Sequence, residues 1–150
     1  KKDEGIKYKK YYDYAPTCCL LINNRVFGTV GEMDEKYFLY YDDSDFLYRA
    51  NKKGYKVFFC PESVIFHKVS LATGGDKSPT SLYYSNRNRF YFIKKNKLGL
   101  FAKLFAYFSR KIKILISKIK RTTDWIYIRE GMKDFKNGKM YRKEDLKKLG

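Results

Sequence analysis

Apolar residues in the first half of the chain form short runs that suit strands. The run TCCLLI, residues 17–22, is continuous, which is typical of a strand buried on both faces. Residues 55–60 and 63–67 follow each other closely around Pro61, and alternation of their side chains predicts two further strands. We therefore expect a short mixed sheet.

Two helices are expected among these strands. A short helix should end at Val30, with Asn23 or Asn24 as its N-terminal cap. Residues 43–53 start with acidic and end with basic side chains, and a glycine follows them, which fits the helix dipole and the usual C-terminal stop. Strands and flanking helices together predict an α/β fold. Residues 70–81, rich in Ser, Thr and Gly, predict a flexible linker or lid.

Between residues 98 and 120 the apolar positions recur at steps of three and four, which predicts a long amphipathic helix. Its apolar stripe comprises Phe101, Leu104, Phe105, Phe108, Ile112, Leu115, Ile116 and Ile119. Lysines and arginines occupy the rest of the circumference, which is the layout of a helix lying in a membrane interface. A helix packed on its own domain with a solvated basic face is the other interpretation, and the pattern leaves both open.

The 150 residues are the length of one domain, and 44% apolar residues suffice for a core. The 33 basic and 16 acidic residues give a net charge of +17, which favours anionic partners. Residues 1–93 hold 15 Lys and Arg against 11 Asp and Glu, whereas 94–150 hold 18 against 5. We therefore divide the chain into a region 1–93 and a basic, helical C-terminal region 94–150.

Cys18, Cys19 and Cys60 form an odd set without metal-ligand or redox spacing, and their apolar surroundings predict buried thiols in a reducing compartment. No apolar run reaches the length of a membrane span, and residues 1–10 lack the apolar part of a signal peptide. The expected location is cytoplasmic, with attachment to a membrane surface left open.

The densest acidic cluster consists of Asp42, Asp43 and Asp45, at the predicted start of a helix. Three carboxylates this close repel one another, so at least one is expected to have a raised pKa unless a cation or hydrogen bonds compensate. A raised pKa suits a general base. Helix capping and the helix dipole account for one or two of these residues without any chemistry.

His67 is the single histidine, and it lies at the end of a predicted strand beside the 70–81 linker. This position suits a site, although one imidazole is not a metal site by itself. In the stretch YYSNRNR, residues 83–89, Arg87 and Arg89 could grip a phosphate. An ordinary helix start with solvated arginines is the other interpretation.

The order of these residues across 14–70 resembles the acceptor-side half of bacterial family 2 glycosyltransferases of the GT-A type, notably the rhamnosyltransferase-like members. The matching positions are Gly31, Asp34, Glu35, Phe38, Asp42, Asp43, Asp45, Arg49, Gly54, Tyr55, Pro61 and His67. Two positions depart from the pattern, since Glu32 replaces a glycine and Asp42 replaces a glutamate. The resemblance continues through 83–88 and more faintly to Gly131, Asp134 and Gly138.

The resemblance implies an inverting transfer of a sugar from a nucleotide-diphosphate donor to a hydroxyl of a cell-surface glycan or lipid-linked acceptor. It implies that Asp43 is the general base. It places Asp42 and Asp45 beside this base, and Asp34, Arg49 and Arg87 in substrate binding. Mg²⁺ or Mn²⁺ is the implied cofactor, and His67 matches a metal ligand of some relatives.

A complete GT-A domain starts with a donor-binding run of strands and helices that ends in Asp-x-Asp, and no such run precedes residue 14. We therefore expect a partial GT-A fold, with 1–93 as its acceptor-side half, that is inactive alone. Residues 98–120 would attach it to the anionic inner face of the cell membrane. The alternative is a non-catalytic basic module that binds anionic membrane or, less readily, RNA. No RNA-binding motif is present, so no nucleic-acid partner is expected.

Overall fold

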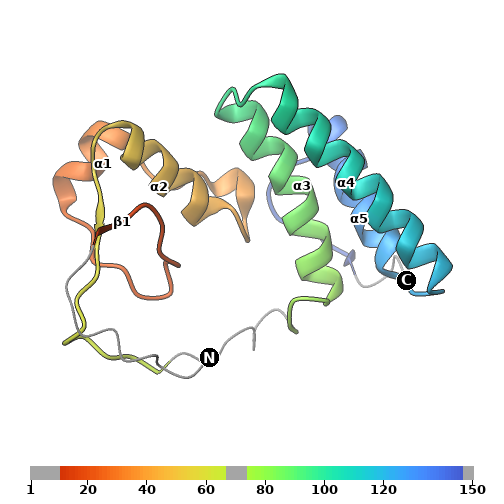
Figure 1. Ribbon diagram of the computed structural model, residues 1–150, viewed down its shortest axis with the longest axis horizontal. Coiled ribbons are helices and arrows are strands. Elements are labelled where there is room, and N and C mark those ends of the chain that lie inside the picture. The colour runs from red at the N-terminus through yellow and green to blue at the C-terminus, as the bar shows by residue number, and fades with distance from the viewer. Residues whose placement is uncertain (1–10, 67–73, 147–150) are drawn as a thin grey trace. The chain divides into compact units, whose positions relative to one another are not determined.

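The computed structural model describes residues 11–66 and 74–146 (Figure 1). The chain forms two compact units, one of residues 1–33 with 43–68 and the other of residues 34–42 with 69–150. The described part is a mixed α/β structure that is mostly helical and has one small antiparallel sheet.

The sheet belongs to the first unit and pairs β1 (Tyr11–Tyr12) with β2 (Val57–Phe58). Tyr11 lies opposite Phe58, and their rings pack with centroids 5.4 Å apart. Aromatic pairs across two strands stabilise a sheet that is too short to be stable by its backbone alone. The sheet is thus smaller than the mixed sheet that the sequence predicts.

The two helices of the first unit confirm the predicted ones. Helix α1 (Asn24–Val30) begins after Asn23, whose side chain accepts a hydrogen bond from the amide of Arg25. It ends at Gly31, which has a φ of +79°, a conformation that glycine adopts without strain. Helix α2 (Asp42–Lys52) follows, and Phe46 on its buried face packs against Phe27 of α1.

Two of the predicted strands are wrong. Residues 17–22 form a turn and irregular backbone, and residues 63–66 are irregular, while residue 67 lies outside the described residues. A strand needs a neighbour for its backbone groups, and neither segment pairs with another part of the described chain. Leu21 and Phe66 are almost fully exposed. The expected burial of Cys18, Cys19 and Cys60 is wrong as well, because all three are exposed.

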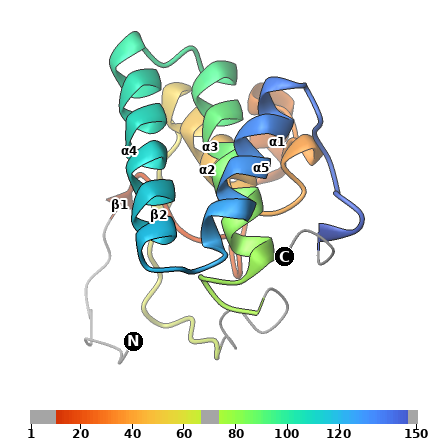
Figure 2. The ribbon, with the colours of Figure 1, turned by 90° about the vertical axis from the view of Figure 1, so that its right-hand side faces the viewer.

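The second unit consists of a turn and three helices that lie side by side (Figure 2). The turn is the 3-10 helix η1 (Glu35–Tyr37). The helices are α3 (Pro79–Lys95), α4 (Leu100–Ile119) and α5 (Asp124–Lys136). Helix α3 starts with Pro79 after Ser78, whose hydroxyl caps the amide of Ser81. Part of the predicted 70–81 linker therefore belongs to a helix, and residues 67–73 lie outside the described residues.

Helices α3 and α5 cross at Gly131 with their backbones in close contact. A Cβ atom at Gly131 would lie 2.6 Å from the carbonyl oxygen of Tyr83 and 3.1 Å from the amide nitrogen of Arg87. Only glycine allows this approach. The core beside the crossing is formed by Leu82, Tyr83, Tyr84, Tyr127, Ile128 and Leu146.

Helix α4 confirms the helix predicted at 98–120, but its apolar stripe points away from the unit. The buried positions of α4 are Ala106 and Ser117, which are small. All eight residues of the stripe are exposed, among them Phe101 at 82% and Ile119 at 71%. Helix α4 packs against α3 and α5 through other residues, and neither of these helices covers the stripe.

Helix α3 runs through residues 93 and 94, the boundary expected between the two regions, and packs against α5. The division into 1–93 and 94–150 stays a prediction. Within the described ranges no helix is long and apolar enough to cross a membrane.

Candidate functional site

The Asp43 carboxylate lies in the first turn of α2 and is held from two sides. One oxygen accepts a hydrogen bond of 2.9 Å from the hydroxyl of Tyr14. The other accepts from the amide of Ser44 at 2.6 Å and from its hydroxyl at 3.2 Å. Asp43 is half-buried. These bonds fix the orientation of the carboxylate and leave part of its surface open to solvent.

Asp45, one turn along α2 from Asp42, is completely buried and is compensated by a cation. The Nε of Arg49 donates to an Asp45 oxygen at 2.9 Å. The two terminal nitrogens of Arg49 donate to the carbonyl oxygens of Val30 and, at 2.7 Å, of Glu32. Arg49 therefore ties α2 to the end of α1. The sequence left open whether a cation or hydrogen bonds compensate the charge of this cluster. In the structure, Arg49 pairs with Asp45, and Tyr14 and Ser44 donate hydrogen bonds to Asp43.

Asp34 caps η1 and anchors the start of the aromatic run on α3. It accepts hydrogen bonds from the hydroxyl of Tyr91 at 2.8 Å and from the ammonium of Lys95 at 2.7 Å. Burial alone would raise the pKa of Asp34, but these bonds and one from the amide of Lys36 outweigh burial and hold the pKa below its ordinary value. Asp34 is therefore an ionised anchor.

The guanidinium of Arg87 is completely buried and binds main-chain carbonyls. It donates to the oxygens of Tyr37 at 2.9 Å, Lys36 at 3.2 Å and Tyr141 at 2.6 Å. Its carbon also lies 4.8 Å from the centroid of the Tyr84 ring. Arg87 thus joins the turn at η1 to the C-terminal segment, and a contact between Arg87 and a substrate stays a prediction.

Asn88, beside Arg87 in the second unit, is a residue that the sequence analysis missed. Its buried side-chain amide donates to the carbonyl oxygens of Tyr37 at 2.9 Å, Leu39 at 2.7 Å and Tyr40 at 2.9 Å. An asparagine in a helix is most often exposed, so a single sequence gives little signal for such a role. The sequence offers one indication: Asn88 directly follows Arg87, and both side chains bind carbonyls of the turn at η1.

The aromatic run that Asn88 holds has a strained backbone. Phe38, Tyr40 and Tyr41 have φ values of +63°, +63° and +71°. Bulky residues rarely adopt this conformation, and each costs on the order of 1–3 kcal/mol unless its surroundings enforce it. Asp42 follows Tyr41 directly, so the strained run leads into the acidic cluster.

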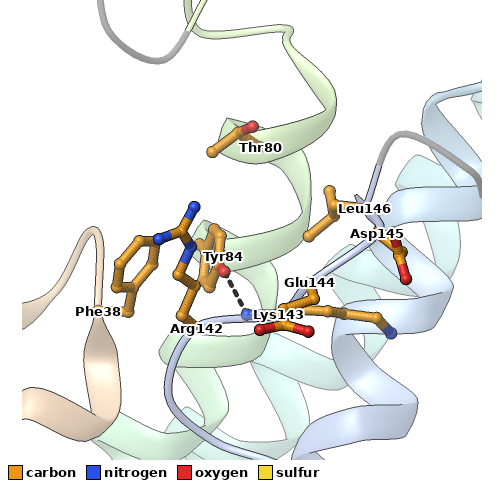
Figure 3. Close-up of a pocket in the computed structure, with 8 residues that line it drawn as sticks. All are labelled: Phe38, Thr80, Tyr84, Arg142, Lys143, Glu144, Asp145 and Leu146. Carbon is orange, nitrogen blue, oxygen red and sulfur yellow. Dashed lines mark hydrogen bonds between the residues drawn. The ribbon is translucent and has the colours of Figure 1, made fainter.

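A pocket of about 800 Å³ lies beside the run within the second unit (Figure 3). It is lined by Phe38, Thr80, Tyr84, Arg142, Lys143, Glu144, Asp145 and Leu146. The Arg142 guanidinium lies 5.8 Å from the centroid of the Phe38 ring, and the amide of Lys143 donates to the Tyr84 hydroxyl at 2.7 Å. Aromatic rings beside charged hydrogen-bonding groups suit a small polar ligand with one flat face.

The residues that the structure describes do not form a metal centre by themselves, because no three His, Cys, Asp or Glu side chains among them converge on one point. His67, the predicted ligand, lies outside the described residues. A site for Mg²⁺ or Mn²⁺ would therefore need further ligands, and the cofactor stays a prediction.

Comparison with known proteins identifies glycosyltransferases as similar to part of this chain. A low-salt glycan biosynthesis hexosyltransferase of Haloferax volcanii is 30% identical over 81 residues, which are 54% of this chain and 26% of that protein. N-acetylglucosaminyl-diphospho-decaprenol L-rhamnosyltransferase of Mycobacterium tuberculosis is 38% identical over 58 residues, which are 39% of this chain and 19% of that enzyme. The matches support a glycosyltransferase-like relation.

The chain thus matches about a quarter or less of the length of these relatives. No family model matches the chain. No solved structure matches it either.

Proposed function

We propose that this chain is the acceptor-side part of an inverting family 2 glycosyltransferase of the GT-A type, related to rhamnosyltransferases. The whole protein would transfer a sugar from a nucleotide-diphosphate donor to a hydroxyl of a cell-surface glycan or lipid-linked acceptor. The observation that carries the proposal is the half-buried Asp43 carboxylate, held by Tyr14 and Ser44 at the start of α2. It occupies the position that the resemblance gives to the general base.

In the proposed reaction Asp43 takes the proton of the acceptor hydroxyl while that oxygen forms a bond to the anomeric carbon of the donor sugar. The bond from this carbon to the phosphate oxygen breaks, and the nucleoside diphosphate leaves with the electron pair. A positioned base contributes roughly 10² to 10⁴ in rate. The hydrogen bond from Tyr14 would orient the carboxylate for this step.

The other residues of the predicted site would act mainly by positioning. Arg49 fixes the first turns of α2 through Asp45 and two main-chain carbonyls. Asp34 and Arg87 hold the start of the aromatic run through groups of their own unit. Catalytic roles for Asp42 and Asp45 and substrate contacts by Asp34, Arg49 and Arg87 stay predictions. Within the second unit, the pocket at Phe38 is our candidate for binding a sugar ring.

Two exposed apolar segments support the proposal that the chain is part of a larger fold. Residues 17–22 and 63–66 have the composition of buried strands but pair with nothing in the described chain. Leu21 is fully exposed, and Phe66 is 98% exposed. Neighbouring strands of a GT-A sheet would cover such segments. We therefore expect the 150 residues alone to bind a sugar nucleotide poorly and to catalyse no transfer.

The test uses the product of the complete gene, supplied with membrane lipids and a panel of radiolabelled nucleotide-diphosphate sugars. Replacing Asp43 by Asn should lower transfer about 10²-fold or more, because the amide cannot accept the proton. The matched control is Asp76→Asn, an exposed residue outside the site. An Asp43→Asn protein that transfers sugar within threefold of the parent would refute the base assignment.

A second candidate is a non-catalytic basic module that binds an anionic membrane, less readily RNA. The outward apolar stripe of α4 favours membrane attachment under either proposal. We propose that α4 holds the protein peripherally on the inner face of the cell membrane. The two candidates differ in sugar transfer, which only the first one predicts.

A further inference from the structure

Three cations come together where α4 faces α3. The Nη1 of Arg110 on α4 donates to the side-chain oxygen of Asn86 on α3 at 3.0 Å, which fixes Arg110 against that helix. Arg89 lies three residues after Asn86 on α3, and Lys113 lies three residues after Arg110 on α4. Residues three apart share one face of a helix. Arg89, Arg110 and Lys113 therefore point into the same region.

Within the described ranges these cations lack an ion-pair partner. No carboxylate there forms an ion pair with Arg89, Arg110 or Lys113. The Nε atoms of Arg89 and Arg110 are buried and have no hydrogen-bond partner. Buried polar groups are nearly always hydrogen-bonded, so two orphaned donors in one cluster require an explanation. Arg87, two residues before Arg89, shows the contrast, since it binds three carbonyls.

The cluster is electrostatically unfavourable as it stands. Burial and the nearby charge of Arg89 lower the pKa of Arg110. Burial and the charges of Arg110 and Arg89 likewise lower the pKa of Lys113, against a weaker opposite effect of Asp124. Like charges that disfavour one another are relieved by an anion with several acceptor oxygens. Lys113 is exposed, so the cluster is open to solvent on its side.

We propose that Arg89, Arg110 and Lys113 bind a phosphate group. Phosphate carries up to two negative charges and three or more acceptor oxygens, which match guanidinium groups in geometry as well as in charge. A carboxylate offers only two oxygens and one charge for three cations. The site does not depend on the proposed sugar transfer, and its ligand comes from solution or from a lipid headgroup.

The test titrates inorganic pyrophosphate into the full 150-residue chain at low ionic strength, with calorimetry as the readout. Lys113→Gln should raise the dissociation constant about tenfold, and Arg89→Gln with Arg110→Gln should abolish binding, since each removes a charge-assisted hydrogen bond. The control is Lys103→Gln, which removes one charge from an exposed position two turns before Arg110. It should change the dissociation constant less than twofold. Lys113→Gln keeps the test valid if the double variant misfolds.

Vesicles of phosphatidylcholine, with and without phosphatidic acid, distinguish the two sources of phosphate. Binding of pyrophosphate that depends on the three residues supports a soluble ligand. Binding only to vesicles with phosphatidic acid, weakened by Lys113→Gln and not by Lys103→Gln, supports a headgroup. The proposal is overturned if neither probe binds, or if Lys103→Gln weakens binding as much as Lys113→Gln does.

Discussion

The hydroxyl of Tyr83 lies 2.7 Å from a carboxylate oxygen of Asp134, and this bond joins α3 to α5 in the interior of the second unit. The same oxygen accepts from the ammonium of Lys143 at 2.6 Å, and Lys143 also reaches Glu130 at 2.8 Å. Both Tyr83 and Asp134 are buried. One carboxylate thus connects two helices and the segment that follows α5.

The Asp134 network should make the unit sensitive to acid. Burial alone would raise the pKa of Asp134, but the bonds from Lys143 and Tyr83 outweigh it and hold the pKa below the ordinary value. A carboxyl whose pKa is depressed on folding stabilises the fold fully above its unfolded pKa, near 3.9. That contribution is lost as the pH falls through the lower folded value. Asp34, whose pKa is also held below its ordinary value, likewise contributes stability that is lost in acid. We expect the melting temperature to fall steeply below about pH 4.

Asp134→Asn isolates this contribution. The variant should be less stable at pH 7, and its melting temperature should depend less on pH between about 5 and 2 than that of the parent, because one depressed carboxyl is gone. The exposed Asp76→Asn serves as the control and should follow the parent. If the melting temperatures of Asp134→Asn and the parent fell equally between about pH 5 and 2, the network would not contribute to stability in acid.

Gly131→Ala should destabilise the second unit by about 1–3 kcal/mol, because a methyl group there overlaps the carbonyl of Tyr83 and forces the helices apart. Chemical denaturation followed by helix content measures the effect. Gly28→Ala in α1 is the control, since its added Cβ would meet no atom within 4 Å beyond the nearby backbone of its own helix, and alanine favours a helix. A Gly131→Ala protein as stable as the parent would contradict the close crossing.

Asn88→Ala should loosen the aromatic run before Asp42. The change removes the amide that donates hydrogen bonds to three carbonyl oxygens. It is expected to lower the free energy of unfolding by about 1–3 kcal/mol. Amide hydrogen exchange at residues 37–41 should become faster, while exchange in α4 should change little. Asn137→Ala, at an exposed asparagine after α5, is the matched control. Unchanged exchange at 37–41 would show that the strained backbone does not need Asn88.

Local patterns predicted α1, α2 and α4, because their signals lie within each segment, whereas α3 and α5 were not predicted as separate helices. Asn23 and Gly31 bound α1, and the three- and four-residue steps of 98–120 match α4 closely. Local patterns could not decide whether residues 17–22 and 63–67 form strands, since a strand depends on a partner strand that local sequence does not reveal. The sequence also left open which way α4 faces, because periodicity defines a stripe and not its neighbour.

The candidate site was predictable in its residue types and less so in its contacts. Asp42, Asp43 and Asp45 share the start of one helix, as expected from their spacing. The roles of Arg49 and Arg87 in holding carbonyls required the three-dimensional structure, because their partners lie 17 to 54 residues away in the chain. Asn88 was missed for the same reason.

The stripe of α4 offers the last test, because its residues can be changed without disturbing the core. Phe105 and Phe108 are 61% and 58% exposed, so Phe105→Glu with Phe108→Glu should leave the melting temperature within a few degrees of the parent. The double variant should lose most of its binding to vesicles that contain anionic lipid, since two aromatic anchors become charged. Co-sedimentation with such vesicles measures this loss.

The control for this double variant is Leu21→Glu, a change of the same kind at a fully exposed residue of the first unit. Leu21→Glu should bind vesicles more strongly than the variant at Phe105 and Phe108, although it also makes the net charge of the chain less positive. Adding salt should weaken the parent's binding, because the basic residues around the stripe act through screened charges. Retained vesicle binding by the double variant would mean that α4 does not contact the membrane. Aggregation or dimerisation of the parent that the double variant abolishes would instead assign the stripe to a protein contact.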